Sequence, residues 1–211
     1  MKMTIALAFL SLTLCYASTV QGDTFGSGTN TFDIDFVTIG NPGNADDTTG
    51  DPNPAGKVDY TYRMGKFEIS EDMIDNANAL GSLGIVKDTL GPNKPATEVN
   101  WLEAAQFVNW LNTSSGSTAA YKFGGLGNFQ LWTPGDAGYD LTNLYRNSLA
   151  TYFLPSMDEW YKAAFYDPSG VYFDYATGSN TEPTAVASGT TAGTAVWADS
   201  SAPRTSRSRV G

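Results

Sequence analysis

The sequence contains no histidine, and a single cysteine, Cys15, occurs in its 211 residues. Without histidine, the chain cannot form a Ser-His-Asp relay, a histidine-ligated zinc site or an iron site of two histidines and a carboxylate. With one cysteine, it cannot form an internal disulfide, so its stability has to come from burial. These absences exclude several classes of enzyme and metalloprotein.

Positive charge is also scarce. The chain has 12 Lys and Arg residues against 22 Asp and Glu residues, a formal net charge of -10. Because nucleic-acid binding needs a basic surface, this balance predicts no nucleic-acid partner. The Gly-rich residues 124–127 lack the strand and lysine context of a phosphate loop. The hydrophobic content of 41%, with 13% aromatic residues, predicts a folded domain.

Residues 1–22 have the layout of a secretory signal peptide. A basic residue precedes the apolar run of residues 5–14, and small residues follow it. The run is too short to span a membrane. Cleavage after Ala17 or Gly22 would remove Cys15, whereas lipidation of Cys15 is the alternative. We therefore expect a secreted, periplasmic or cell-envelope protein with no transmembrane span.

Capping residues mark three expected helix starts. Ser156 and Glu159 have the spacing of a capping box, in which each side chain bonds the backbone N–H of the other residue. Asn100 and Glu103 have the same spacing. Ser70 precedes two acidic residues, which favour the positive end of a helix dipole. We interpret all five capping residues as structural.

Strands are expected over residues 33–39 and 58–69, where β-rich segments flank a loop of Gly, Pro, Asn and Asp over residues 41–56. Residues 112–117 are expected to end the second helix. Residues 113–149 show no sustained periodicity and indicate a long ordered excursion, which is typical of a binding surface.

Helical spacing predicts which residues of the three helices face the core. These are Met73, Ile74 and Ala77 in the first helix, Trp101, Ala104, Ala105, Val108 and Leu111 in the second, and Trp160, Tyr161, Ala163 and Ala164 in the third.

Two kinds of residue are candidates for a binding site: acidic residues for calcium, and aromatic residues for a sugar or a peptide. Asp46 and Asp47 could supply oxygen ligands to calcium, although a solvated acidic loop is the simpler interpretation. Aromatic residues offer either a sugar- or peptide-stacking platform or core packing. Those considered are Tyr60, Tyr62, Trp132, Tyr139, Tyr145, Trp160, Tyr172 and Tyr175.

Two pairs of carboxylates are candidates for glycoside hydrolysis, which needs two carboxyl groups facing one bond. They are Asp158 with Glu159, and Glu98 with Glu103. Because Glu103 and Glu159 are already explained as capping residues, we expect no catalytic residue in either pair.

Three segments carry a recognisable combination of residues. Residues 62–70 read YRMGKFEIS, residues 95–105 read PATEVNWLEAA, and residues 154–166 read LPSMDEWYKAAFY. They resemble the F-x-M-G-x-x-E-V-T, P-V-x-x-V-S-W-x-D-A and R-L-P-T-E-x-E-W-E-x-A-A motifs of the formylglycine-generating enzyme family, also called the sulfatase-modifying factor domain. With the strand and loop of residues 37–48, the resemblance covers residues 36–177.

The resemblance implies an α+β domain over residues 23–203 with the C-type-lectin-like fold, in which a small antiparallel sheet and two or three short helices carry much irregular loop. Phe153 and Ser70 stand where the family usually has Arg and Thr. The later G-N-V-W-E-W and R-G-G-S-W motifs have no counterpart. The family's calcium-binding groups and the cysteine pair that binds catalytic copper belong largely to that later part. We therefore expect no cofactor here, with calcium as the alternative.

The C-terminal segment changes character. Repeated Thr, Ala and Gly over residues 188–195 suggest a flexible loop, and residues 204–211 are basic. We expect a domain that is incomplete at its C-terminus, followed by a disordered tail.

The leading functional hypothesis is an exported, non-catalytic binding or structural module that contacts a protein, a peptide or a carbohydrate. One alternative is a fragment of an enzyme that oxidises a sulfatase cysteine to formylglycine. The other is a calcium-assisted carbohydrate-binding module.

The signal peptide hypothesis predicts a mature N-terminus at Ser18 or Asp23. N-terminal sequencing of exported protein should find one of these residues first. A chain that begins at Met1, or that carries lipid on Cys15, would contradict the hypothesis.

Overall fold

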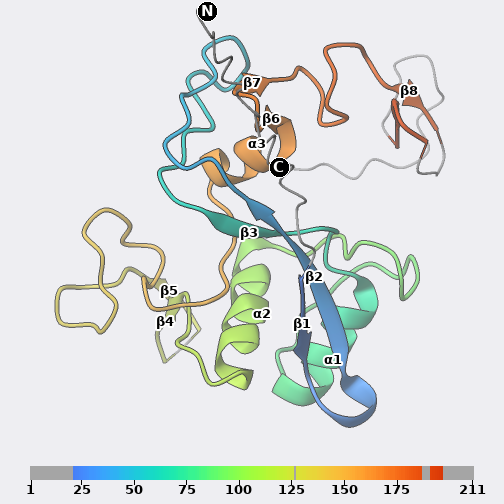
Figure 1. Ribbon diagram of the computed structural model, residues 1–211. Coiled ribbons are helices and arrows are strands. Elements are labelled where there is room, and N and C mark those ends of the chain that lie inside the picture. The colour runs from blue at the N-terminus through green and yellow to red at the C-terminus, as the bar shows by residue number, and fades with distance from the viewer. Residues whose placement is uncertain (1–20, 126, 187–190, 197–211) are drawn as a thin grey trace, which may run out of the picture.

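The computed structural model describes residues 21–125, 127–186 and 191–196 (Figure 1). Residues 1–20 of the expected signal peptide, which was predicted over residues 1–22, and the basic tail at residues 204–211 lie outside them. The described part is an α+β domain with three α-helices and small antiparallel sheets, which confirms the expected class. None of its helices is long and apolar enough to cross a bilayer.

Three antiparallel strands form the main sheet. In spatial order they are β1 (Gln21–Phe25), β2 (Phe32–Ile39) and β3 (Tyr62–Gly65), and the short 3-10 helix η1 (Gly28–Asn30) joins β1 to β2. Burial alternates along the first half of β2, where Phe32 and Ile34 face the core and Asp33 and Asp35 are exposed. This period of two turns one face of the sheet toward the helices.

The remaining strands form two-residue pairs along the loops. They are β4 (Lys122–Phe123) with β5 (Phe129–Gln130), β6 (Tyr166–Asp167) with β7 (Val171–Tyr172), and the parallel pair β8 (Thr184–Ala185) with β9 (Thr194–Ala195).

The sheet begins at Gln21, upstream of the domain boundary expected at Asp23. Gln21 and Gly22 both pair with β2. Cleavage after Gly22 would remove these two residues from β1, whereas cleavage after Ala17 would leave the strand whole.

The carboxylate of Asp23 joins β1 to two distant parts of the chain. It accepts hydrogen bonds from the Arg63 guanidinium on β3, with Nη1 at 3.1 Å, and from the Tyr152 hydroxyl at 2.9 Å. Despite the opposing effect of burial, the hydrogen bonds from Arg63 and Tyr152 lower the pKa of Asp23. The first strand is therefore fixed by residues that follow much later in the sequence.

The strand expected over residues 58–69 is shorter than predicted. Only Tyr62–Gly65 forms β3, because the backbone of Val58 bonds to the preceding loop instead of to β2. The Val58 N–H donates to Asn44 Oδ1 at 3.1 Å, and its carbonyl accepts from the Gly43 N–H at 2.9 Å. The loop over residues 41–56 thus takes the hydrogen bonds that a longer strand would need.

The three helices are α1 (Glu71–Gly81), α2 (Trp101–Ser114) and α3 (Met157–Phe165). Each begins with a side-chain cap: Ser70 accepts from Met73 N at 3.3 Å, Asn100 from Glu103 N at 3.1 Å, and Ser156 from Glu159 N at 3.2 Å. The capping boxes of α2 and α3 are complete, because both glutamates return to the cap N–H. In Figure 1, α1 and α2 lie side by side next to the sheet, while α3 lies near the loops at its other end.

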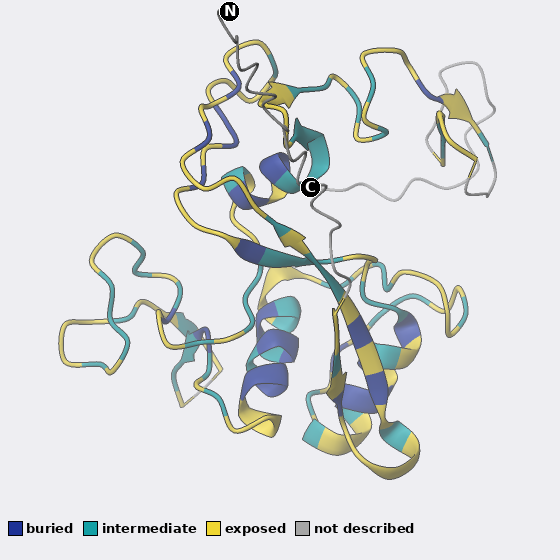
Figure 2. Ribbon diagram, in the orientation of Figure 1, coloured by how far each residue is buried: buried dark blue, intermediate teal, exposed yellow. Residues whose placement is uncertain are grey.

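The inner faces of α2 and α3 differ from the expectation. Trp101, in the first turn of α2, is 45% exposed, and Trp160 on α3 is 52% exposed. In α2, the buried aromatic side chains are Phe107 and Trp110 instead. The buried residues of α3 are Glu159, Tyr161 and Lys162, whose side chains end in polar groups. Figure 2 shows exposed residues at both ends of α2 and buried residues between them.

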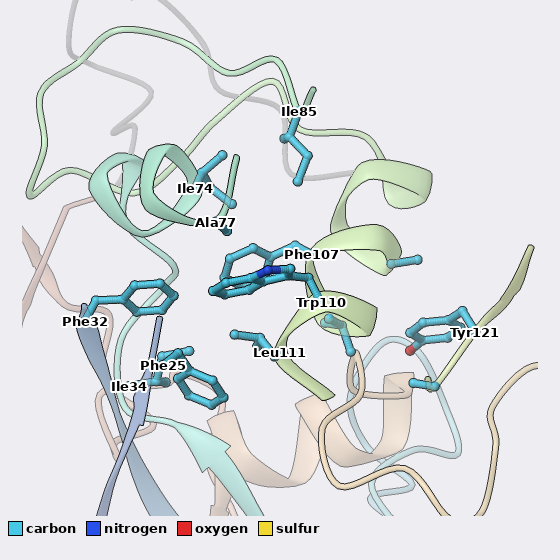
Figure 3. Packing of buried hydrophobic residues seen from close by; sticks show 13 residues of the cluster. Phe25, Phe32, Ile34, Ile74, Ala77, Ile85, Phe107, Trp110, Leu111 and Tyr121 are labelled. Atoms are coloured by element: carbon cyan, nitrogen blue, oxygen red, sulfur yellow. The ribbon is translucent and has the colours of Figure 1, made fainter. Parts of the chain in front are cut away.

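The core lies between the sheet and helices α1 and α2 (Figure 3). Phe32 of β2 is central to it, with ring centroids 5.8 Å from Phe25, 6.5 Å from Phe107 and 6.0 Å from Trp110. Ile74, on α1, is also in this cluster. Each such aromatic contact contributes about 0.5–1.5 kcal/mol beyond the area that it buries.

The second helix ends at Ser114, within the expected range of residues 112–117, but Asn112 in this range is fully buried at 0% exposure. Its amide N–H groups donate to the carbonyls of Val108 at 3.0 Å and Tyr152 at 2.8 Å. Its Oδ1 accepts the N–H groups of Thr151 at 2.9 Å and Tyr152 at 3.0 Å. Three of these four hydrogen bonds join α2 to the segment that leads into α3.

Replacing Asn112 with Ala should lower the free energy of unfolding by about 2–4 kcal/mol, because several buried backbone groups would lose their partners. Urea unfolding of Asn112→Ala and of the neighbouring exposed-site variant Thr113→Ala would measure the difference. The Thr113→Ala change should stay within about 1 kcal/mol. Equal effects of the two substitutions would contradict the assignment.

Candidate functional site

A pocket of about 530 Å³ lies between the start of α2, the β4-β5 hairpin and the segment that leads into α3. Its wall is largely aromatic, and its polar lining residues come from the long excursion and from the α3 cap. The residues that matter for its chemistry are Trp101, Tyr121, Phe129, Tyr145, Arg146 and Ser156.

The aromatic rings of the pocket pack against one another as a continuous wall. Trp101 meets Phe129 edge to face, with centroids 4.9 Å apart and planes at 89°. Phe129 in turn stacks on Tyr145 at 6.1 Å and 5°. Trp101 also meets Tyr121 at 5.3 Å and 75°. Since Trp101 is 45% and Tyr145 60% exposed, the wall presents apolar ring surface to solvent.

Arg146 is held in the pocket lining from several sides. Its Nη1 lies 3.1 Å from both carboxylate oxygens of Glu159, and its Nη2 donates to the Tyr60 hydroxyl at 3.2 Å. Its guanidinium carbon lies 3.8 Å from the ring centroid of Phe153. Burial alone would lower the pKa of Arg146, but the charge of Glu159 and the interactions with Tyr60 together outweigh this effect and raise that pKa. The guanidinium is therefore permanently charged and fixed in position.

Glu159 does more than cap a helix. It is fully buried and accepts hydrogen bonds from Arg146, from the Tyr60 hydroxyl and from the Ser156 N–H. Its backbone carbonyl also accepts the Tyr62 hydroxyl. Burial and the hydrogen bond to Glu159 raise the pKa of Tyr60, so this phenol remains a proton donor. The carboxylate thus joins α3 to the excursion and to the segment before β3.

In the loop considered for calcium, Asp46 agrees with the interpretation as a solvated loop and Asp47 does not. Asp47 is buried, not solvated, and accepts from Thr49 N at 2.8 Å, Thr49 Oγ1 at 2.7 Å and the Tyr161 hydroxyl at 2.7 Å. Although burial opposes it, these hydrogen bonds lower the pKa of Asp47. Asp46 is exposed and accepts from Lys57 N at 3.3 Å. Among the described residues, no cluster of three or more Asp, Glu, His or Cys residues could hold a metal ion.

Of the four carboxylates considered for glycoside hydrolysis, Glu98 is exposed and the other three bind backbone or arginine N–H groups. Asp158 accepts the Gly56 N–H at 2.9 Å, whereas the adjacent Glu159 carboxylate binds Arg146. Glu103 accepts from Asn100 N at 3.0 Å and from Val86 N at 3.1 Å. These carboxylates therefore serve as acceptors for backbone and arginine N–H groups.

Of the aromatic residues considered as a platform, Tyr145 is the one that lines the pocket. Trp101 and Phe129, which form the wall with it, were not among them, because helical spacing placed Trp101 in the core. Tyr172 instead accepts from Asn44 Nδ2 at 2.7 Å, and Trp132 donates its indole N–H to Ala120 O at 3.1 Å. No sequence signal distinguishes a wall residue from a core residue here.

The residues present do not fit the copper centre of the catalytic sulfatase-modifying factors. That centre needs two thiolates, and Cys15 is the chain's single cysteine. Cys15 also lies outside the described residues. No known family model, curated protein or solved structure matches the chain.

Replacing Glu159 with Gln should lower the free energy of unfolding by about 3–5 kcal/mol, because the buried Arg146 charge would lose its carboxylate. Glu103→Gln is the matched control, since Glu103 holds the same position in the α2 capping box. It should cost less than about 1 kcal/mol.

Chemical denaturation of both variants tests this difference. Adding Arg146→Met to Glu159→Gln should recover part of the lost stability, because the unpaired charge is then removed. Similar losses for Glu159→Gln and Glu103→Gln would show that Glu159 acts only as a cap.

Proposed function

We propose that this chain is an exported, non-catalytic binding module of the sulfatase-modifying factor type, and that the pocket beside α2 and α3 is its recognition surface. The observation that carries the proposal is the exposed aromatic wall of Trp101, Phe129 and Tyr145 in a concave site of about 530 Å³. Binding sites are typically concave and lined by aromatic side chains with a few placed polar groups.

The rigidity of the pocket supports a role in recognition. Arg146 is anchored by Glu159 and Tyr60, and Trp101 and Ser156 stand at capped helix starts. Side chains fixed in this way lose little conformational entropy when a ligand binds. The site therefore requires little rearrangement on binding.

The non-catalytic part of the proposal rests on the chemistry of the lining residues. The lining consists of aromatic residues with Asn143, Arg146, Leu154, Pro155 and Ser156, so it holds no carboxylate, thiol, imidazole or amine. Such residues bind and orient but supply no group suited to acid-base catalysis near neutral pH. The alternative, a fragment of a formylglycine-generating enzyme, would have its two copper-binding thiolates in a part of the protein beyond this sequence.

The C-type-lectin-like fold is part of the same proposal. It is supported by the order of the three motif-like segments along the chain. The first forms β3 and the Ser70 cap, the second forms the start of α2, and the third forms α3. Long irregular loops around a small sheet also suit such a fold, in which loops carry the binding surface.

Trp101 and Trp160 are both half-exposed tryptophans on helices, so substituting each of them gives a matched test of the pocket as the binding site. Screening the protein against glycan and peptide arrays should identify a ligand whose affinity falls at least about tenfold in Trp101→Ala, a loss of about 1.4 kcal/mol. Trp160→Ala should leave the affinity unchanged, because Trp160 is outside the pocket lining. Circular dichroism would establish that both variants are folded.

Equal losses in Trp101→Ala and Trp160→Ala, or no ligand on either array, would contradict the proposal. A separate incubation with copper and a cysteine-containing sulfatase peptide should give no aldehyde product by mass spectrometry. Aldehyde formation would refute the non-catalytic assignment.

A further inference from the structure

We infer that the ligand of the aromatic pocket is an uncharged carbohydrate, bound by ring stacking without calcium. The inference rests on the proposed binding function and adds the chemical class of the ligand. It follows from the charges, the ring geometry and the hydrogen-bonding groups of the pocket.

The arginine in the pocket is already neutralised. Arg146 contacts both carboxylate oxygens of Glu159, donates to the Tyr60 hydroxyl and lies over the Phe153 ring. An anionic ligand would have to compete with a buried carboxylate that is held in place by three sets of hydrogen bonds. Displacing one partner of such a buried pair is strongly unfavourable.

The two helix starts at the pocket are neutralised in the same way. Trp101 is the first residue of α2 and Ser156 is the cap of α3, so both positive helix ends border the site. In each capping box, however, a glutamate carboxylate binds the cap N–H. Carboxylates at these positions offset the helix dipoles and reduce their attraction for an anionic ligand.

A cationic ligand is also disfavoured. No carboxylate lines the pocket, and the Arg146 guanidinium forms part of it. Recognition of a quaternary ammonium uses several ring faces turned toward one point. Here Trp101, Phe129 and Tyr145 pack on one another, so their faces form a wall and not a cage.

The geometry of the aromatic wall also favours a sugar over a proline-rich peptide as the ligand. Proline-rich segments insert side chains into grooves between aromatic rings. Centroid distances of 4.9 Å between Trp101 and Phe129 and 6.1 Å between Phe129 and Tyr145 leave no such gap. A pyranose instead lays its apolar C–H face flat on an exposed ring, and Trp101 and Tyr145 offer ring surface for this contact.

Hydrogen-bond donors at the pocket complete the match to hydroxyl groups. Asn143 Oδ1 accepts the N–H groups of Tyr145 and Arg146 at 3.2 Å each, which leaves its amide N–H groups as donors. Ser156 Oγ accepts from Glu159, so its hydroxyl proton remains to be donated. The Trp101 indole N–H has no acceptor among the described residues. Sugar hydroxyl and ring oxygens can accept all three.

The test uses the full-length mature protein and a panel of neutral oligosaccharides, including xylo-, cello-, manno- and chito-oligosaccharides, with sulfated counterparts. Isothermal titration calorimetry should detect binding of a neutral member. Its affinity should change less than about twofold between about 0.05 M and 0.5 M salt, because no net charge is paired. Excess EDTA should have no effect.

Three variants in the pocket and one control variant outside it locate the site. Tyr145→Ala and Trp101→Ala should each weaken binding at least about tenfold, and Trp160→Ala should leave it unchanged. Asn143→Asp keeps the acceptor for the turn but removes the donors, so it should weaken binding about tenfold. Tyr145 is exposed at the end of the wall, so its removal leaves the core intact even if Trp101→Ala unfolds.

The remaining outcomes overturn the inference. Preference for a sulfated sugar with salt-sensitive binding would show a charged ligand, and loss of binding in EDTA would show a calcium-assisted site. Trp101-dependent binding of a peptide, without sugar binding, would refute the sugar but retain the binding module. Absence of both sugar and peptide binding would refute the two proposals together.

Discussion

The buried carboxylate of Glu159 is the contact on which most of the described architecture around α3 depends. It joins the Ser156 cap, the Arg146 guanidinium and the Tyr60 hydroxyl, which come from three separate parts of the chain. A buried charge is tolerated only when its acceptor capacity is fully used, and here it is. Because Arg146 is fixed through this carboxylate, the shape of the aromatic pocket depends on a residue that does not line it.

The rest of α3 repeats this use of polar groups. Tyr161 donates to Asp47 at 2.7 Å, and the buried Lys162 donates to the Asn41 carbonyl at 2.9 Å. Burial lowers the pKa of Lys162. The molecule therefore has two differently stabilised parts: an aromatic core between the sheet and helices α1 and α2, and a hydrogen-bonded assembly around α3. Such satisfied polar contacts fix one arrangement of loops, which apolar packing alone does not specify.

Local features of the fold could be predicted from the sequence, and long-range features could not. The starts of all three helices were predictable because a capping box involves residues three apart. The ion pair of Glu159 with Arg146 was not, because no local pattern connects a helix cap to an aperiodic segment. The same limit explains why Trp101 was wrongly predicted to be buried, since its helical spacing indicated core packing. Its exposure depends on where the first turn of α2 lies relative to the sheet, which is a tertiary property.

The attachment of β1 has a consequence for the order of folding. Asp23 emerges early during synthesis, yet its partners Arg63 and Tyr152 follow about 40 and 129 residues later. The first strand therefore cannot complete its contacts until most of the domain has been made. Contacts between residues so far apart in the sequence form late and slow folding.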